Sequence, residues 1–159
     1  MNLDFISEAL KDVCNVEIVE YDGYERAVIA AEGFEEVIEV HYFPDGYYKY
    51  TVNFASWHME TSSREDLLDS VLAFVDAEYA AIEFFGEGVA CFGGAVEIDI
   101  AEDISYEALR EMFDEDEDIT KLTFSVRSWN RYCCYDGIFV KHAETGYTVF
   151  RIYKGTADR

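Results

Sequence analysis

The sequence predicts an α+β protein with antiparallel sheet and about three helices, with two small α/β-sheet lobes as an alternative arrangement. Three observations lead to this prediction. Short segments rich in Val and Ile follow one another with turn residues between them. A few stretches repeat apolar residues at helical spacing. Strands and helices do not alternate as they do in βαβ folds. We therefore treat residues 1–159 as a single compact acidic domain, with sub-lobes at about 1–80 and 81–159 as the alternative.

The expected helices are the segments in which apolar side chains return every three or four residues. These segments are residues 3–13, 63–79 and 104–113. The second is the clearest, because Ser62 and Glu65 form a capping-box pattern at its start. The apolar side chains of this helix lie on one side of it, and acids lie on the opposite side. Asp103 is the expected N-cap of the third helix.

The expected strands form two runs. The first run is 15–21, 25–31, 36–43 and 47–54; the second is 81–85, 95–100, 119–131, a strand from 133 or 138 to 141, and 147–154. Pro44-Asp45-Gly46 favours a turn, because Pro presets φ and Gly accepts positive φ. Asp136-Gly137 and Thr145-Gly146 suit hairpin turns.

The composition is that of a folded, strongly acidic protein. The 159 residues include 34 Asp and Glu against 12 Lys and Arg, a net charge of −22, and 50% of the residues are hydrophobic. Such a chain can bury a core, which excludes wholesale disorder. Like charges repel, so we expect no direct binding to nucleic acid. We also expect no membrane association, because no apolar run approaches the ~18–20 residues of a membrane span.

The charge is unevenly distributed along the chain. Residues 1–120 contain 31 acidic and five basic residues, whereas residues 121–159 contain three acidic and seven basic residues. Asymmetry of this kind indicates an interaction surface.

Some of the acids recur every four residues on the predicted helices, which places them in rows. The rows are Asp4, Glu8 and Asp12 on the first helix and Glu107, Glu111 and Glu115 on the third, where Asp114, Asp116 and Asp118 adjoin them. Neighbouring like charges destabilise a helix by about 0.2–0.5 kcal/mol per pair. We interpret the rows as an acidic ridge that imitates a line of phosphates and binds a cationic groove. The third-helix row is the first choice for this ridge.

The basic end of the chain has three interpretations. Lys121, Thr123, Ser125, Arg127, Trp129 and Arg131 are expected on one face of the strand 119–131. These basic residues either contact the acidic body internally, or form a second partner-binding surface, or bind nucleic acid. The second surface would consist of Arg127, Trp129, Arg131 and Tyr132, with the aromatic rings as anchors.

The sequence contains no recognisable catalytic or metal-binding motif, so we expect no enzyme activity, cofactor or metal. The glycines of 86–94 lack the spacing of a phosphate loop, and His41, His58 and His142 lie far apart. Asp114–Asp118 fails the calcium-loop pattern, because the sixth position is Ile119 rather than Gly.

The cysteines and the clustered carboxylates lead to two further expectations. The four scattered cysteines and the absence of a signal peptide indicate reduced thiols in the cytoplasm. Clustered carboxylates should have raised pKa values, so that the melting temperature rises as the pH falls from 7 toward about 5.

In size, charge and carboxylate rows the chain is similar to small phage-encoded inhibitors of bacterial defence nucleases, including acidic anti-restriction and anti-CRISPR proteins, several of which mimic nucleic acid. No motif aligns, so this resemblance identifies no functional residue. It implies a non-enzymatic inhibitor whose partner is a basic nucleic-acid-binding protein, such as a nuclease or its complex. An immunity or antitoxin protein against a cationic nuclease toxin is the first alternative, and a small enzyme is the second. The oligomeric state stays open.

Overall fold

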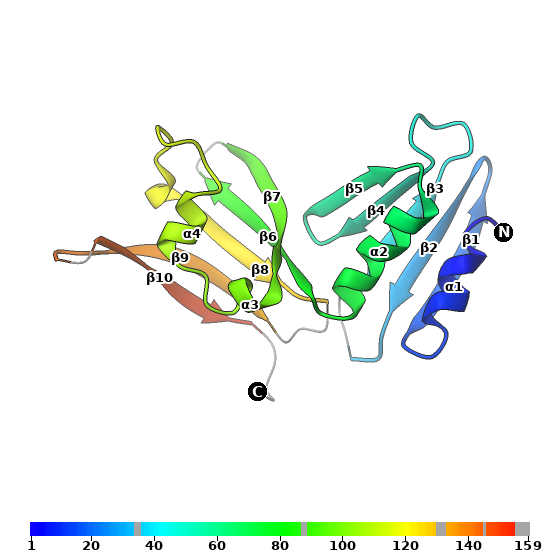
Figure 1. Cartoon of the computed structure of the whole chain (residues 1–159), viewed down its shortest axis with the longest axis horizontal. Helices are drawn as coiled ribbons and strands as arrows, with labels where there is room; N and C mark the ends of the chain where they lie inside the picture. Colours follow the sequence, from blue (N-terminus) through cyan, green and yellow to red (C-terminus); the bar gives the residue numbers. More distant parts are fainter. Residues whose placement is uncertain (34–35, 87–88, 130–132, 145, 155–159) are drawn as a thin grey trace. The chain divides into compact units, whose positions relative to one another are not determined.

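The computed structural model describes residues 1–33, 36–86, 89–129, 133–144 and 146–154 (Figure 1). The chain divides into two compact units, Met1–Ala77 (unit 1) and Glu78–Arg159 (unit 2). Each unit has a five-stranded antiparallel sheet and its own helices, which confirms the α+β class.

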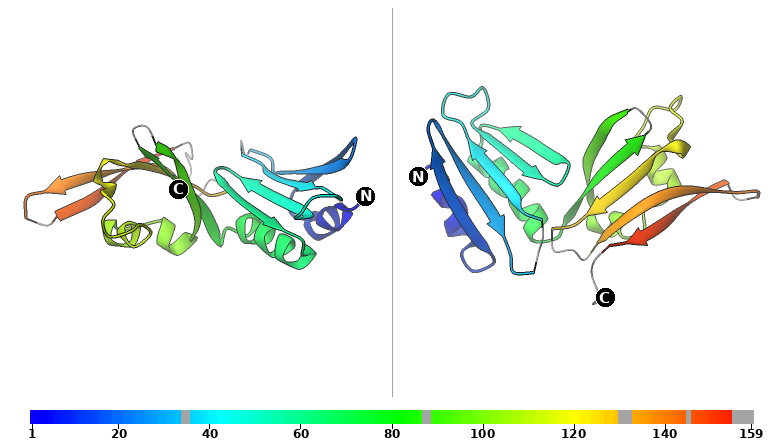
Figure 2. Two further views of the ribbon diagram at one scale, coloured as in Figure 1. Left: turned by 90° about the horizontal axis from the view of Figure 1, so that it is seen from above. Right: turned by 180° about the vertical axis from the view of Figure 1, so that it is seen from behind.

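Unit 1 is a meander of five antiparallel strands between two helices. Its elements are α1 (Asp4–Leu10), β1 (Asn15–Tyr21), β2 (Tyr24–Ala30), β3 (Ile38–Tyr42), β4 (Tyr50–Phe54), β5 (Trp57–Thr61) and α2 (Arg64–Val75). The strand order in the sheet is the order in the chain. Both helices lie against the same face of the sheet (Figure 2).

Period-two alternation explains why that face is covered. In β2, Ala27 and Ile29 are fully buried, and their neighbours in the register are Val40 and Ile38 of β3. The helices supply the other half of this core; the buried residues of α1 and α2 are Ile6, Leu10, Leu67, Val71, Phe74 and Val75. The opposite face of the sheet is not covered by the helices of unit 1.

Unit 2 places a hairpin at each edge of its five-stranded sheet. Its elements are β6 (Tyr79–Gly86), β7 (Val89–Glu97), α3 (Ile98–Ala101), α4 (Tyr106–Arg110), the 3₁₀-helix η1 (Ile119–Lys121), β8 (Thr123–Arg127), β9 (Cys134–His142) and β10 (Gly146–Tyr153). The strand order is β10-β9-β8-β6-β7.

The core of unit 2 forms where the helical segments cover one face of this sheet. Phe84, Phe124 and Tyr135 come from three neighbouring strands, and Leu109 and Ile119 close over them. The Tyr135 hydroxyl donates a hydrogen bond to the backbone oxygen of Ala101 at 2.6 Å. Burial raises the pKa of Tyr135 to about 12, so the phenol keeps its proton and this hydrogen bond at neutral pH.

Gly137 has no side chain, and the ring of Phe124 occupies the space beside it in this core. The two residues are register partners on β9 and β8. A Cβ atom on Gly137 would lie 2.2 Å from Cζ of Phe124, closer than two carbon atoms can approach. The dipeptide Asp136-Gly137, expected as a hairpin turn, therefore lies inside β9, and that prediction is wrong. The glycine is required by packing rather than by a turn.

Several other boundaries differ from the sequence predictions for local reasons. β5 was not expected; it completes the sheet by pairing Trp57 with Phe54 of β4. Ser63 rather than Ser62 caps α2, accepting a hydrogen bond from the backbone N–H of Asp66 at 3.2 Å. Residues 98–100, expected as the end of the strand 95–100, belong to α3 (Ile98–Ala101). The turn at residues 43–46 is confirmed by a hydrogen bond from the backbone N–H of Gly46 to the oxygen of Phe43 at 3.1 Å.

We expect Gly137→Ala to destabilise the protein by about 1–3 kcal/mol, because the added methyl group overpacks the core against Phe124. Urea unfolding followed by circular dichroism measures this change. Gly94→Ala is the matched control, since its nearest heavy atom would be Cγ2 of Ile82 at 4.0 Å, an ordinary contact. Equal stability of the two variants would contradict the packing argument, and Phe124→Leu should restore part of the loss in Gly137→Ala.

Candidate functional site

The first-choice acidic ridge does not form a continuous helical row. α4 spans only Tyr106–Arg110, Glu111 is its C-cap, and Glu115 lies beyond it. Ser105, rather than the expected Asp103, caps the helix through its hydroxyl. The alignment of Glu107, Glu111 and Glu115 along one helix is therefore a wrong prediction.

Local hydrogen bonds explain why this helix stops. The guanidinium of Arg110 donates to the backbone oxygen of Asp114, and the backbone N–H of Asp114 donates to the Glu117 carboxylate at 3.0 Å. Asp118 then caps η1, accepting from the Thr120 backbone N–H at 3.1 Å. These contacts fold the acidic run into turns. The acids themselves are at the surface; Glu107, Glu111, Asp114, Glu115, Asp116 and Asp118 are all exposed.

The second-choice row on α1 is short and partly paired. Asp4 and Glu8 lie on the helix, whereas Asp12 follows its end. The Asp4 carboxylate contacts the N-terminal amine at 2.8 Å, and Glu8 contacts Lys11 at 2.6 Å. Exposed pairs of this kind contribute little to stability and are screened by salt. A cationic partner could therefore replace either cation.

A longer row of carboxylates lies on α2. Residues four and eleven positions apart return to nearly the same side of a helix, which brings Glu65, Asp69 and Asp76 into line along its 12 residues. Asp76 is the C-cap. These acids were expected on the arc opposite the apolar side chains, but the ridge was predicted on other helices. Their spacing on the clearest predicted helix was the signal that could have identified them.

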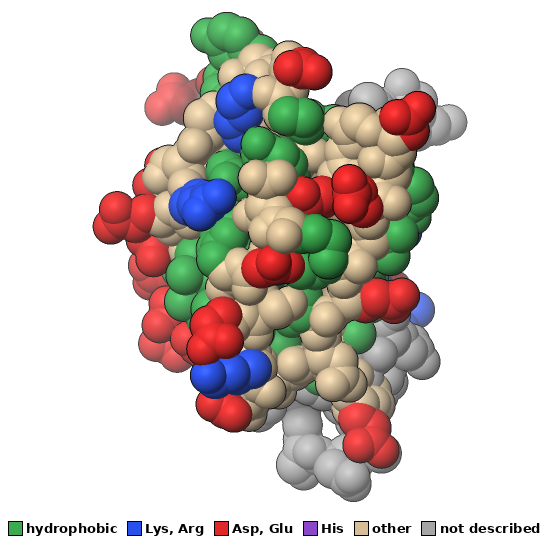
Figure 3. All heavy atoms as spheres, turned by 90° about the vertical axis from the view of Figure 1, so that its right-hand side faces the viewer, with side chains coloured by type: hydrophobic (Ala, Val, Ile, Leu, Met, Phe, Trp, Pro, Cys, Tyr) green, Lys and Arg blue, Asp and Glu red, His purple; other side chains and the backbone are tan. Residues whose placement is uncertain are grey.

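The two helices together form one acidic surface of unit 1, because both cover the same side of its sheet (Figure 2). We call this surface the acidic helix face; its exposed acids are Asp4, Glu8, Asp12, Glu65, Asp66, Asp69 and Asp76. One of its two basic residues, Lys11, contacts Glu8. The other, Arg64, donates to the Tyr50 hydroxyl at 3.1 Å and lies over the ring of Phe5. Figure 3 shows that acidic side chains far outnumber basic ones on the end of unit 1 that it draws.

Three basic residues of unit 2, Arg127, Arg151 and Lys154, make ion pairs within the unit. Arg127 contacts Asp136 at 2.8 Å, and Lys154 contacts the other oxygen of the same carboxylate at 3.1 Å. Arg151 contacts Asp103 at 3.3 Å and lies over the Tyr135 ring. The internal-contact interpretation is confirmed for Arg151 alone, because its partner Asp103 belongs to the acidic part of the sequence, whereas Asp136 lies within the basic end.

The aromatic anchor expected in the second partner-binding surface is buried. β8 ends at Arg127, and Trp129 follows it with only 3% of its surface exposed, so the ring belongs to the interior. The expectation that Trp129 anchors a partner is therefore wrong. The Arg127 guanidinium is held by the backbone oxygens of Val126 and Tyr135 as well as by Asp136. Arg131 and Tyr132 lie outside the described residues.

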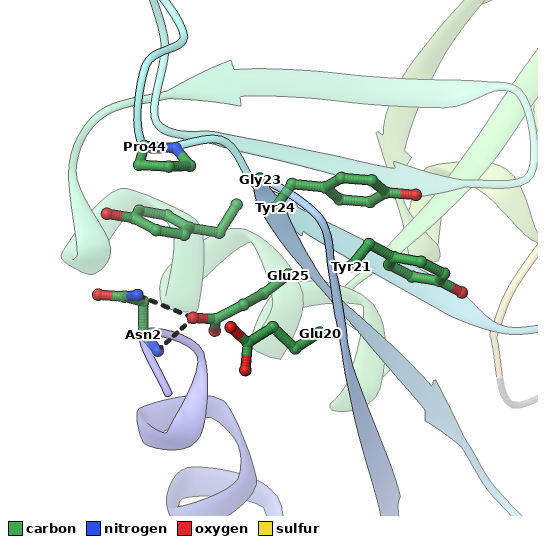
Figure 4. A pocket seen from close by; sticks show the side chains of 8 residues that line it. Asn2, Glu20, Tyr21, Gly23, Tyr24, Glu25 and Pro44 are labelled. Carbon is green, nitrogen blue, oxygen red and sulfur yellow. Dashed lines mark hydrogen bonds between the residues drawn. The ribbon is translucent and has the colours of Figure 1, made fainter.

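A buried carboxylate anchors the start of the chain to the sheet. Glu25 on β2 accepts hydrogen bonds from the backbone N–H and side-chain amide of Asn2 at 2.9 and 2.8 Å, and from the backbone N–H of Leu3 at 3.0 Å (Figure 4). Burial by itself would raise the pKa of Glu25, but these donors lower it on balance. Glu20 lies opposite Glu25 in the register and lines the same pocket.

Other carboxyl groups shift in the same direction. The Arg26 guanidinium lowers the pKa of Glu39, and Arg127 and Lys154 lower that of Asp136 against the opposing effect of burial. Hydrogen bonds from Thr120 lower the pKa of Asp118. At Glu25 and these three positions the expectation of raised values is wrong, because local donors outweigh repulsion between acids.

The described residues show no group of three or more His, Cys, Asp or Glu side chains that could hold a metal ion. The histidines serve local contacts: His41 lies 3.4 Å from Glu39, and His142 lies 2.7 Å from the Thr148 hydroxyl. The Glu25 carboxylate in the pocket of Figure 4 already accepts three hydrogen bonds.

Comparisons with protein-family models, with curated proteins and with solved structures found no match for this chain. In the part of the chain that the structure describes, no helix has the length and apolarity needed to cross a membrane.

We expect Glu25→Gln to lower stability at pH 7 by about 1–3 kcal/mol, because buried N–H donors lose a charged acceptor. A carboxyl whose folded pKa is lowered stabilises the fold above its unfolded pKa, near 4.5, and this contribution is lost as the pH falls through the folded pKa. The difference in melting temperature between wild type and variant should therefore shrink as the pH falls from 7 toward 3. Glu17→Gln, at an exposed position on β1, is the control; a difference that stays constant with pH would contradict the assignment.

Proposed function

We propose that this chain is a non-enzymatic acidic inhibitor that binds a basic nucleic-acid-binding protein in the cytoplasm. More specifically, we propose that it is an inhibitor of the anti-restriction or anti-CRISPR type. It would mimic nucleic acid and occupy the basic groove of a bacterial defence nuclease. The observation that carries this proposal is the acidic helix face of unit 1, where five exposed carboxylates stand on two helices against one sheet and two more, Asp12 and Asp76, follow the helix ends.

The arrangement of these carboxylates suits a phosphate-binding groove. Acids one helical turn apart are about 6 Å from each other, and duplex DNA carries one charge per ~1.7 Å of axis over both strands. Glu65 and Asp69 are one turn apart, whereas Asp76 follows Asp69 by seven residues, or about 10 Å along the helix. The row therefore approximates part of one strand with a wider gap rather than a duplex. A groove that is lined with Lys and Arg to neutralise phosphates would be attracted to this row, and the association would be rapid and sensitive to salt.

The distribution of basic side chains supports the same proposal. Arg127, Arg151 and Lys154 are used in contacts inside unit 2. Unit 1 itself has 17 acidic and 4 basic residues, a net charge of −13.

A second candidate function is the immunity or antitoxin protein, and one observation favours it. The open face of the unit 1 sheet carries a row of aromatic rings: Tyr21 and Tyr24 stack at 4.7 Å, and Tyr24 and Phe43 at 5.3 Å. Aromatic residues dominate the energy of protein interfaces. An inhibitor that used this face would block a toxin without imitating its nucleic acid.

We expect that neutralising the α2 row slows association with the target. The triple variant Glu65→Gln, Asp69→Asn, Asp76→Asn should lower the on-rate on the order of tenfold at low salt and less at high salt, because charges at an interface mainly steer association. Binding kinetics on an immobilised target measure both rates. The matched control neutralises three exposed acids elsewhere in unit 1, Glu17, Glu32 and Glu60, and leaves the net charge equal to that of the triple variant. Equal effects of the two variants would show that only bulk charge matters.

We expect this chain and the target's nucleic acid to exclude each other from the target. The target is first isolated from a host lysate at low salt and identified by mass spectrometry of the proteins that elute at high salt. Its binding to a labelled nucleic acid is then titrated with this chain. Competition supports mimicry. A ternary complex without mutual loss of affinity rejects mimicry, and Tyr24→Ala then tests the aromatic face of the immunity alternative.

A further inference from the structure

β10 forms an open edge of the unit 2 sheet. In the described part of the chain it pairs with β9 on one side and with no strand on the other. The backbone N–H of Lys154 donates to the oxygen of Cys134 at 2.9 Å. Since hydrogen-bonded pairs alternate along an antiparallel ladder, even-numbered residues of β10 bond β9. The odd-numbered residues Tyr147, Val149 and Arg151 therefore direct their N–H and C=O groups toward the open edge.

The outer face of the same hairpin is apolar. Phe150 and Ile152 of β10 are 56% and 49% exposed, and Ile138 and Val140 of β9 are also exposed. Phe150 is the register partner of Ile138, so the four side chains form one patch across the two strands. We call this the β9–β10 patch. The single charged residue of β10, Arg151, is directed to the other face, where it contacts Asp103.

The other edge strands of the two sheets each carry acidic residues. β1 has Glu17 and Glu20, β5 has Glu60, and β7 ends at Glu97. Proteins use charges at sheet edges to prevent strands of other molecules from pairing with them. β10 has no acidic residue, although 34 of the 159 residues in the chain are acidic. This edge therefore lacks the protection that the rest of the molecule has.

We propose that this chain forms a homodimer in which β10 pairs antiparallel with β10 of a second copy. The two sheets of unit 2 then continue across a two-fold axis, and the β9–β10 patches of the copies adjoin. A two-fold axis makes identical strands antiparallel, and with the axis at Phe150 the two Phe150 rings lie opposite each other, while each Ile152 lies opposite Thr148 of the other copy.

The charge of the patch selects a second copy over a cationic partner. Residues 134–153 contain two acidic and two basic residues, a net charge of zero. A cationic protein is attracted to acids, and the acid beside the patch, Asp136 opposite Ile152, is already paired with Arg127 and Lys154. Two neutral apolar patches can meet without local repulsion. The net charge of −22 on each copy opposes approach only at longer range, where salt screens it. Dimerisation should therefore strengthen with salt, while binding of the cationic target should weaken.

The test is sedimentation velocity of the full chain at low and high salt over a range of concentrations. We expect a species of twice 18.3 kDa whose fraction rises with concentration and with salt. Phe150→Asp places two carboxylates beside each other in the dimer and should raise the dissociation constant on the order of 10- to 100-fold. Tyr47→Asp is the matched control, because Tyr47 is 92% exposed in unit 1 and the change in charge is the same.

A monomer at every concentration and salt would overturn the proposal, as would a dimer that resists Phe150→Asp or that Tyr47→Asp disrupts equally. Circular dichroism checks that each variant folds. If Phe150→Asp does not fold, Val149→Pro decides the question, because it removes an N–H from the open edge without removing a bond to β9. Loss of the dimer in that variant supports strand pairing, and its retention rejects it. None of these outcomes depends on binding of the cationic target.

Discussion

A net charge of −22 obliges this chain to keep its carboxylates at the surface while it buries enough apolar area to remain folded. Both units meet this constraint in the same way. Each covers one face of an antiparallel sheet with short helical segments and places its acids on helices, turns and strand edges. Period-two alternation keeps the two requirements apart, because successive side chains of a strand lie on opposite faces. The position of nearly every carboxylate follows from this separation.

Where a carboxylate is drawn inward, it is held by several donors. Glu25 accepts three hydrogen bonds from the first residues of the chain, and Asp136 contacts both Arg127 and Lys154. A carboxylate removed from water needs such partners, since the cost of desolvation is otherwise large. These two acids therefore act as ties: Glu25 fixes α1 to the sheet, and Asp136 joins β8, β9 and the end of β10.

The consequence is a molecule with two kinds of surface. The acidic helix face of unit 1 is suited to a cationic partner, whereas the β9–β10 patch of unit 2 is neutral and apolar. Electrostatic attraction and apolar contact respond oppositely to salt here, because screening weakens the first and relieves the repulsion that opposes the second. The proposed cationic target and the proposed second copy would then bind one chain through different residues.

The sequence by itself determined the fold class and the strand β1 to the residue. These properties are local: they depend on alternation, helical spacing and turn residues within a few positions. The tertiary structure alone decided where elements stop and which residues are buried. Glu107 and Glu115 are not in one row because contacts of Arg110 and Asp118 end the helix, and Trp129 is interior because β8 ends at Arg127. Gly137 lies within a strand because the ring of Phe124, thirteen residues earlier, occupies the space of its missing side chain. Such a constraint depends on distances between strands, which no local pattern of residues specifies.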